Sequence, residues 1–127
     1  MHLDKFDIPT RIAIDGAVAR QFTNFGEPEG TFGVEYFSLA TGVDMAPLLA
    51  GLEDDMCHSP HWGYVVQGSV VVTYADGSAE TCAGGEVFHW PAGHSVRVED
   101  DADIVLFSPQ REHGEVMDHI AAKLAAV

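Results

Sequence analysis

Short runs of β-branched and aromatic residues, separated by Gly, Pro and Asp, constrain the fold of this chain more than any other feature. They cover residues 12–14, 18–22, 32–39, 64–74, 79–82, 87–90, 96–98 and 104–107. Segments of strand length with turn residues between them predict an all-β sandwich or barrel. The pair Asp76-Gly77 follows one of these runs and indicates a type I′ hairpin, in which both central residues take positive φ.

Two segments depart from the β pattern. Residues 44–52 predict a short turn of helix. Near the C-terminus, Val116, Ile120 and Leu124 recur every four residues. This spacing is typical of an amphipathic helix, which we expect over residues 114–126. We expect its apolar face to pack on the outside of the barrel or against a second subunit.

Length and charge limit the organisation and the partners of the chain. Its 127 residues suit a single domain, with a barrel core over about residues 12–108. Acidic residues number 20 against 6 basic ones, a net charge of −14. Such a surface repels nucleic acid and anionic lipid, so neither is an expected partner.

The sequence also predicts a cytoplasmic protein. No apolar run approaches the ~18 residues that a membrane span needs. The first residues carry no basic segment followed by an apolar one, as a secretory signal would. Without such a signal, the two cysteines, Cys57 and Cys82, are expected to be reduced.

Histidines are the most informative of the polar residues. His58 and His61 stand with Cys57 just before an apolar strand, and His94 follows the turn at residues 91–93. Imidazole and thiol groups at strand ends are candidate metal ligands, because barrel folds gather their ligands at the mouth of the barrel.

The segment from residue 64 to 70 resembles the strand and turn that close the first cupin motif, G-x5-H-x-H-x3,4-E-x6-G. When the motif is anchored on Gly68, its Glu position falls on His61. With the shorter spacing, the second His position falls on Cys57 and the first on Asp55.

The second cupin motif, G-x5-P-x-G-x2-H-x3-N, is matched by Gly85, Pro91 and Gly93. Its His position falls on Val96, and the available histidine is His94, two residues earlier. A strand alternates its faces with period two, so both residues face the same way. Either the preceding turn is compressed, or His94 does not reach the metal.

This resemblance implies an all-β cupin-type double-stranded β-helix, a jelly-roll barrel, with a C-terminal α-helix and one metal site. The ligands that it implies are His61, His94 and Cys57, with His58 and Asp55 less favoured. Nitrogen and sulfur donors suit zinc best, and iron or nickel are alternatives.

Other residues near the motifs have more ordinary expected roles. His89 either lines the cavity or is exposed, and His113 and His119 are expected at the surface. The aromatic residues that flank the motifs are expected to pack in the core, with cavity walls as the alternative: Trp62, Tyr64, Phe88 and Trp90.

Two functions remain open from the sequence. In the first, a three-ligand site keeps a coordination position free, and the chain is a metal-dependent enzyme acting on a small molecule in the barrel. In the second, a fourth ligand from His58 or Asp55 closes the site, and the chain is a non-catalytic sensor or storage module. A homodimer is expected in either case, because cupins commonly pair and an exposed helix stripe would be an unusual apolar patch.

Overall fold

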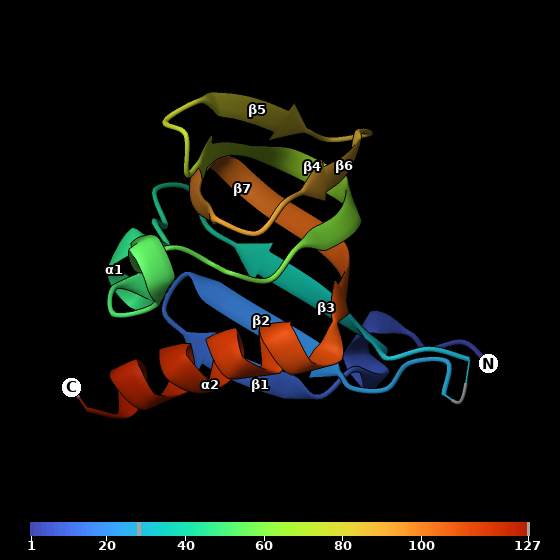
Figure 1. Cartoon of the computed structure of the whole chain (residues 1–127). Coiled ribbons are helices and arrows are strands. Elements are labelled where there is room, and N and C mark those ends of the chain that lie inside the picture. The colour runs from blue at the N-terminus through green and yellow to red at the C-terminus, as the bar shows by residue number, and fades with distance from the viewer. Residues whose placement is uncertain (28, 127) are drawn as a thin grey trace.

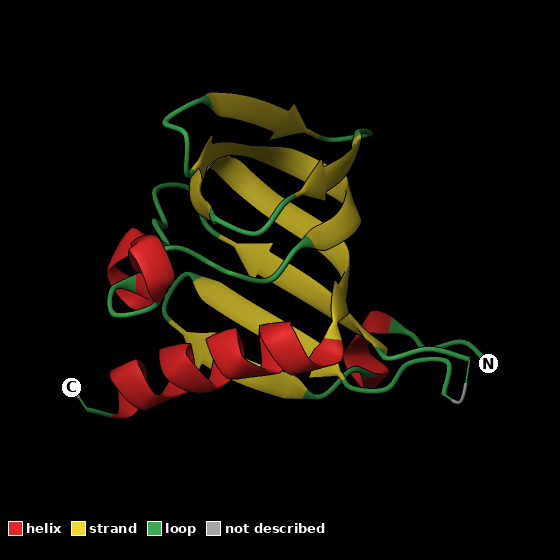
Figure 2. Cartoon of the chain, in the orientation of Figure 1, coloured by secondary structure: helices red, strands yellow, loops and turns green. Residues whose placement is uncertain are grey.

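A computed structural model describes residues 1–27 and 29–126. The strands are β1 (Thr10–Ile14), β2 (Ala17–Phe22), β3 (Phe32–Leu39), β4 (His61–Tyr74), β5 (Ala79–Ala83), β6 (Val87–Trp90) and β7 (His94–Pro109). The helices are α1 (Ala46–Leu49) and α2 (Gln110–Ala125), with 3-10 turns η1 (Lys5–Asp7) and η2 (Glu53–Asp55). The expected all-β architecture with a C-terminal helix is confirmed (Figures 1 and 2).

The strands form one antiparallel sheet in the order β1-β2-β3-β7-β4-β5, and β6 also pairs with β4. The sheet closes on itself because β4 bends: its register against β7 shifts repeatedly between Val65 and Val70. Gly68 lies in this bend with φ +81°, and a Cβ there would collide with the backbone of Asp101. The first half of β4 therefore pairs with β6 and the second half with β5, which gives a barrel.

Two local expectations need correction. Residues 94–109 form one continuous strand, not two, because the acidic middle segment of β7 also pairs with β3 and β4. The turn between β4 and β5 is not type I′: Gly77 has φ +87°, but Asp76 is not among the residues with positive φ. Asp76 Oδ1 instead accepts a hydrogen bond from the backbone N–H of Ser78 at 2.9 Å.

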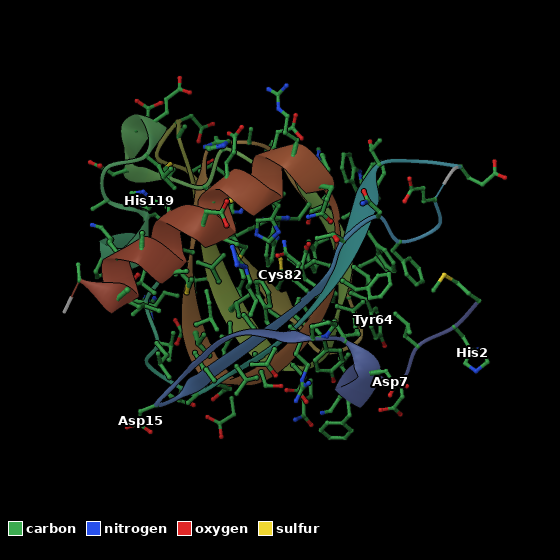
Figure 3. All side chains as sticks on the ribbon, turned by 90° about the horizontal axis from the view of Figure 1, so that it is seen from below. His2, Asp7, Asp15, Tyr64, Cys82 and His119 are labelled. Atoms are coloured by element: carbon green, nitrogen blue, oxygen red, sulfur yellow. The ribbon has the colours of Figure 1, made fainter. Side chains whose placement is uncertain are left out.

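Helix α2 closes one side of the barrel rather than lying outside it. It starts at Gln110, earlier than expected, because the N–H of Gln110 donates to the carbonyl of Thr31 at 2.8 Å. The view from below shows α2 lying opposite β1 and β2 (Figure 3). The stripe of α2 is buried in a cluster with the inner faces of β1 and β2: Val116 (1 % exposed), Met117 (1 %) and Ile120 (2 %), against Ile12 and Ala19.

The expected packing of the helix stripe against a second subunit is therefore wrong, because the same chain already covers it.

Among the described residues, no helix is long and apolar enough to cross a membrane.

Candidate metal centre

Three predicted site residues meet at the ends of strands. Cys57 precedes β4, His61 is the first residue of β4, and His94 is the first residue of β7. Their exposed fractions are 5 %, 3 % and 2 %. One donor atom from each lies within 4.8 Å of the others. The structure thus brings together the three side chains that the sequence singled out.

A short backbone bridge explains how His94 reaches this group in spite of its offset from the motif. The N–H of Cys57 donates to the carbonyl of His94 at 2.9 Å, and the N–H of Gly93 donates to the carbonyl of Cys57 at 2.8 Å. Cys57 and His94 are therefore neighbours across an isolated antiparallel bridge. Of the two alternatives that the sequence left open, the geometry favours a turn that lets His94 face the other two donors.

The hydrogen bonds of His94 leave one ring nitrogen free. Its Nδ1 lies 2.7 Å from the carbonyl oxygen of Pro91. A carbonyl only accepts, so Nδ1 carries the proton and Nε2 keeps its lone pair. This is the tautomer that a metal-binding histidine needs.

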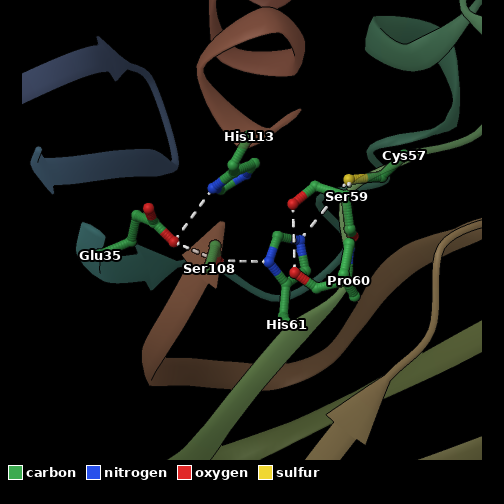
Figure 4. Close-up of polar contacts among 7 residues, drawn as sticks. All are labelled: Glu35, Cys57, Ser59, Pro60, His61, Ser108 and His113. Atoms are coloured by element: carbon green, nitrogen blue, oxygen red, sulfur yellow. Dashed lines mark hydrogen bonds and ion pairs between the residues drawn. The ribbon is translucent and has the colours of Figure 1, made fainter. Parts of the chain in front are cut away.

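His61 is held in the same tautomer by a chain of two buried hydrogen bonds (Figure 4). Ser108 Oγ donates to Glu35 Oε1 at 2.6 Å, so its oxygen accepts the proton on His61 Nδ1, also at 2.6 Å. His61 Nε2 is left unprotonated and lies 3.5 Å from Cys57 Sγ. Both imidazoles therefore have a free Nε2 beside or near the sulfur.

Sequence reasoning missed the residues behind His61. Glu35 on β3 is fully buried, and His113 in the first turn of α2 is 3 % exposed. His113 Nδ1 lies 3.0 Å from Glu35 Oε1, and these two residues form a second group of possible donors with His61. The expectation that His113 lies at the surface is wrong. Its place three residues before Val116 puts it on the apolar stripe of the helix, a signal that was present in the sequence.

Burial shifts the pKa values of the three candidate donors, His61, His94 and Cys57, toward their neutral forms. It lowers the pKa of His61 well below its ordinary value, and the nearby His113 and His94 lower it further. Burial also lowers the pKa of His94 to about 4, although the hydrogen bond to Pro91 opposes this. For the thiol of Cys57, burial raises the pKa to about 12, and the charge of Glu35 adds to the effect. The imidazoles are ready to coordinate at neutral pH, whereas the thiol needs a cation to ionise.

The two less favoured candidates do not join the group. His58 Nε2 lies 3.2 Å from Glu115 Oε2 on α2. Asp55 is exposed, and its Oδ1 accepts from the N–H of Gly51 at 2.9 Å.

The remaining histidines and aromatic residues divide by the face on which they lie. Phe88 and Trp90 are buried, as expected, whereas Trp62 and Tyr64 are 42 % and 43 % exposed. The alternation of β4 turns them outward, because His61 and Val65 occupy its inner face. His89 is exposed and stacks on Trp62 with ring centroids 5.1 Å apart.

His119 is partly buried rather than fully at the surface. Its Nε2 donates to the carbonyl oxygen of Ala50 at 2.9 Å.

A cavity of about 80 Å³ lies inside the barrel, and Cys57, His61, His94 and His113 line it. Most of its other walls are aliphatic, and they come from the inner faces of the strands and from α1 and α2. The candidate donors thus face a largely apolar space.

Comparison with known proteins identifies the fold. No protein-family model matches the sequence, and no curated protein matches it. Among solved structures, oxalate decarboxylase of Bacillus subtilis, an enzyme with Mn(II) centres, aligns with a TM-score of 0.63 and 19% identity over 85% of this chain. The chain spans only 29% of that enzyme.

Two smaller proteins align over more of their own length. The polyketide cyclase RemF of Streptomyces resistomycificus has a TM-score of 0.58 and 16% identity, over 86% of this chain and 78% of the cyclase. Ectoine synthase of P. lautus has a TM-score of 0.56 and 12% identity, over 78% and 67%. These are cupin-fold proteins, and the fold that the sequence resemblance implied is confirmed.

Proposed function

We propose that this cupin-fold chain binds one divalent transition metal ion through Cys57, His61 and His94, and binds or transforms a small molecule in the barrel cavity. One observation carries the proposal: two buried imidazoles have their Nδ1 protons fixed by acceptors, and a sulfur lies within 4.8 Å of their free donor atoms. Both Nε2 atoms are left unprotonated, as metal coordination requires, and the thiol of Cys57 lies 3.5 Å from that of His61.

Zinc is the metal that this donor set favours, with iron or nickel as alternatives. Two imidazoles and one thiolate are softer donors than the carboxylates and carbonyls that Mn²⁺ and Mg²⁺ prefer. Three protein donors are also the number that catalytic zinc sites use, with a fourth position left for a ligand.

The chemistry at such a site divides between the ion and the chain. When bound, the ion would act as a Lewis acid toward an oxygen atom of the ligand. Glu35 and Ser108 orient His61, and the aliphatic walls exclude water from its surroundings. His113 lies against His61 with ring centroids 4.4 Å apart, and its Nδ1 lies 3.0 Å from Glu35 Oε1.

The second candidate function is ligand binding without turnover. It is favoured by the lining of the cavity, because His113 is the only titratable lining residue, among those described, outside the three proposed donors. Both candidates need the metal, and they differ in whether a bound small molecule is released unchanged.

Metal content tests the shared part of the proposal. Protein purified without chelator should carry about one equivalent of metal per chain. His61→Ala should remove most of it, and the matched control His58→Ala should retain it. Less than a tenth of an equivalent in the unmodified protein, with no uptake of added Zn²⁺, Fe²⁺ or Ni²⁺, would overturn the proposal.

We also propose that the protein works in the cytoplasm. The support is that Cys57 and Cys82 are both free and buried. Unpaired cysteines are typical of a reducing compartment.

We propose a homodimer that forms through the outer face of the barrel and not through the stripe of α2. The outer face of β4, β6 and β7 carries an apolar patch, which we call the outer patch: Trp62 (42 % exposed), Tyr64 (43 %), Val66 (43 %), Val87 (81 %) and Phe107 (40 %). Its exposed area is on the order of 500 Å², at the upper end of what monomers show. A standard interface buries about 800 Å² per partner, of which somewhat more than half is apolar. The outer patch is large enough to supply this apolar part.

A second copy of this chain is the partner that the outer patch fits. The patch itself is uncharged, so two chains of charge −14 can meet there without opposing carboxylates. Light scattering should report a dimer, and Trp62→Glu should dissociate it while Ala79→Glu on exposed β5 does not. A monomer of 13.7 kDa at micromolar concentration would contradict this proposal.

A further inference from the structure

The walls of the barrel cavity restrict what it can bind. Its polar lining residues are Cys57, His61, His94, Ser95 and His113, and every other lining residue is aliphatic or aromatic. Among the described residues, no Lys, Arg, Asp or Glu lines it. A charged group far from the three proposed metal donors would therefore lie against hydrocarbon without a counter-ion.

The size of the cavity favours an organic ligand. Its volume of about 80 Å³ exceeds the 10–15 Å³ that one water molecule needs. Ordered water also needs two or more polar partners, and the aliphatic part of the wall offers none. A hydrocarbon group fills such a space at no loss of hydrogen bonds.

The charge of the proposed centre points to the head group. A divalent ion with one thiolate and two neutral imidazoles carries one net positive charge. One monoanionic group would neutralise it, whereas a second anionic group on the same molecule would be buried without a partner. Glu35 is not counted among the ligands, because it faces Ser108 and His113. Its negative charge acts on Cys57 and makes a second anionic group at the ion still less favourable.

We infer that the ligand of this cavity is a small monocarboxylate with an uncharged apolar body. This rests on the proposed function, because the head group would sit at the metal held by Cys57, His61 and His94. Dicarboxylates such as oxalate do not fit, even though an oxalate decarboxylase shares the fold. The apolar body is inferred from the walls alone and does not depend on the metal.

Chain length provides the test. Straight-chain monocarboxylates from acetate to octanoate are titrated into zinc-loaded protein by calorimetry. Each added methylene should tighten binding about fourfold until the cavity is full. Malonate and succinate should bind at least tenfold more weakly than the monocarboxylates of equal carbon number. Affinity that does not change with chain length, or a preference for the dicarboxylates, would overturn the inference.

The same titration with 1-alkanols on chelated protein separates the two proposals. If no metal binds but the alcohols still show the chain-length dependence, the metal proposal fails and the apolar cavity stands. If zinc binds at one equivalent but neither series depends on chain length, the metal proposal stands and the inference fails.

Variants of the wall locate the ligand. Ala19→Leu adds bulk to the inner face of β2 and should weaken octanoate at least tenfold, with zinc content unchanged. Val18→Leu, on the outer face of the same strand, is the matched control. Ile120→Ala enlarges the cavity and should move the optimum to a longer chain, which keeps the test valid if Ala19→Leu does not fold. No change in either cavity variant would contradict binding inside the barrel.

Discussion

Replacement of Ser108 tests most directly the two hydrogen bonds that orient His61. The Ser108 hydroxyl links His61 Nδ1 to Glu35 Oε1, with both contacts at 2.6 Å and all three side chains buried. Ser108→Ala leaves the buried N–H of His61 without its acceptor and the buried carboxylate of Glu35 without the hydroxyl that donates to it. Each unsatisfied group costs about 1–3 kcal/mol. We therefore expect the free energy of unfolding to fall by about 3 kcal/mol. The loss should not reach the sum of the two upper values, because Glu35 keeps its contact with His113.

The same replacement should weaken metal binding, because nothing would then fix the tautomer of His61. Loss of such a partner lowers metal affinity by about 10- to 100-fold. Urea unfolding of the chelated protein measures the first effect, and competition for zinc with a chromogenic chelator measures the second. Ser69→Ala removes an exposed hydrogen bond to Asp100 and serves as the control, with a change under about 0.5 kcal/mol. A Ser108→Ala protein as stable as this control, with unchanged zinc affinity, would refute the reasoning.

Three other predictions follow from the same group of residues. Cys57→Ser should abolish the thiolate-to-metal absorption of the Co²⁺-substituted protein in the near ultraviolet. If the unmodified protein lacks this band, the sulfur is not a ligand. Alkylation of Cys57 should be slow even after chelation, because burial raises the pKa of its thiol to about 12; rapid labelling would contradict that burial. The chelated protein should lose stability between pH 7.5 and 5, and about 2 kcal/mol of this loss should come from His94, because its pKa is lowered from 6.5 to about 4 and only the unfolded chain takes up the proton in that range. His61, whose pKa is also lowered, should add to the loss. His94→Gln should reduce the pH dependence measured by urea unfolding by the share of His94, and an unchanged slope would assign the dependence to other groups.

The parts of the fold that the sequence predicts are those set by neighbouring residues. The strand runs follow from local alternation, and Gly68 marks a bend that only a residue without a side chain allows. Anchoring the motif on Gly68 singled out His61 and Cys57, which the structure brings to within 4.8 Å of His94. The exposure of Trp62 and Tyr64 was also accessible, because they alternate with His61 along one strand.

The parts that it does not predict depend on contacts between distant segments. His94 reaches the other donors through a backbone bridge to Cys57, which no spacing within either motif encodes. Glu35 supports His61 through a serine that lies 73 residues later in the chain. On its strand Glu35 stands among residues that read as an ordinary β segment, so its inward orientation appears only when β3 pairs with β7.

Helix α2 connects the two parts of the proposed site. Its stripe seals the cavity with Val116, Met117 and Ile120, and the same face carries His113 to Glu35 behind His61. A stripe on a helix indicates that the face is buried, but it does not say whether the covering surface belongs to the same chain. Here the barrel of the same chain supplies it, because β7 runs directly into α2 without a linker. The helix is therefore part of the wall of the cavity, and a small displacement of α2 would change both the volume for the ligand and the position of His113.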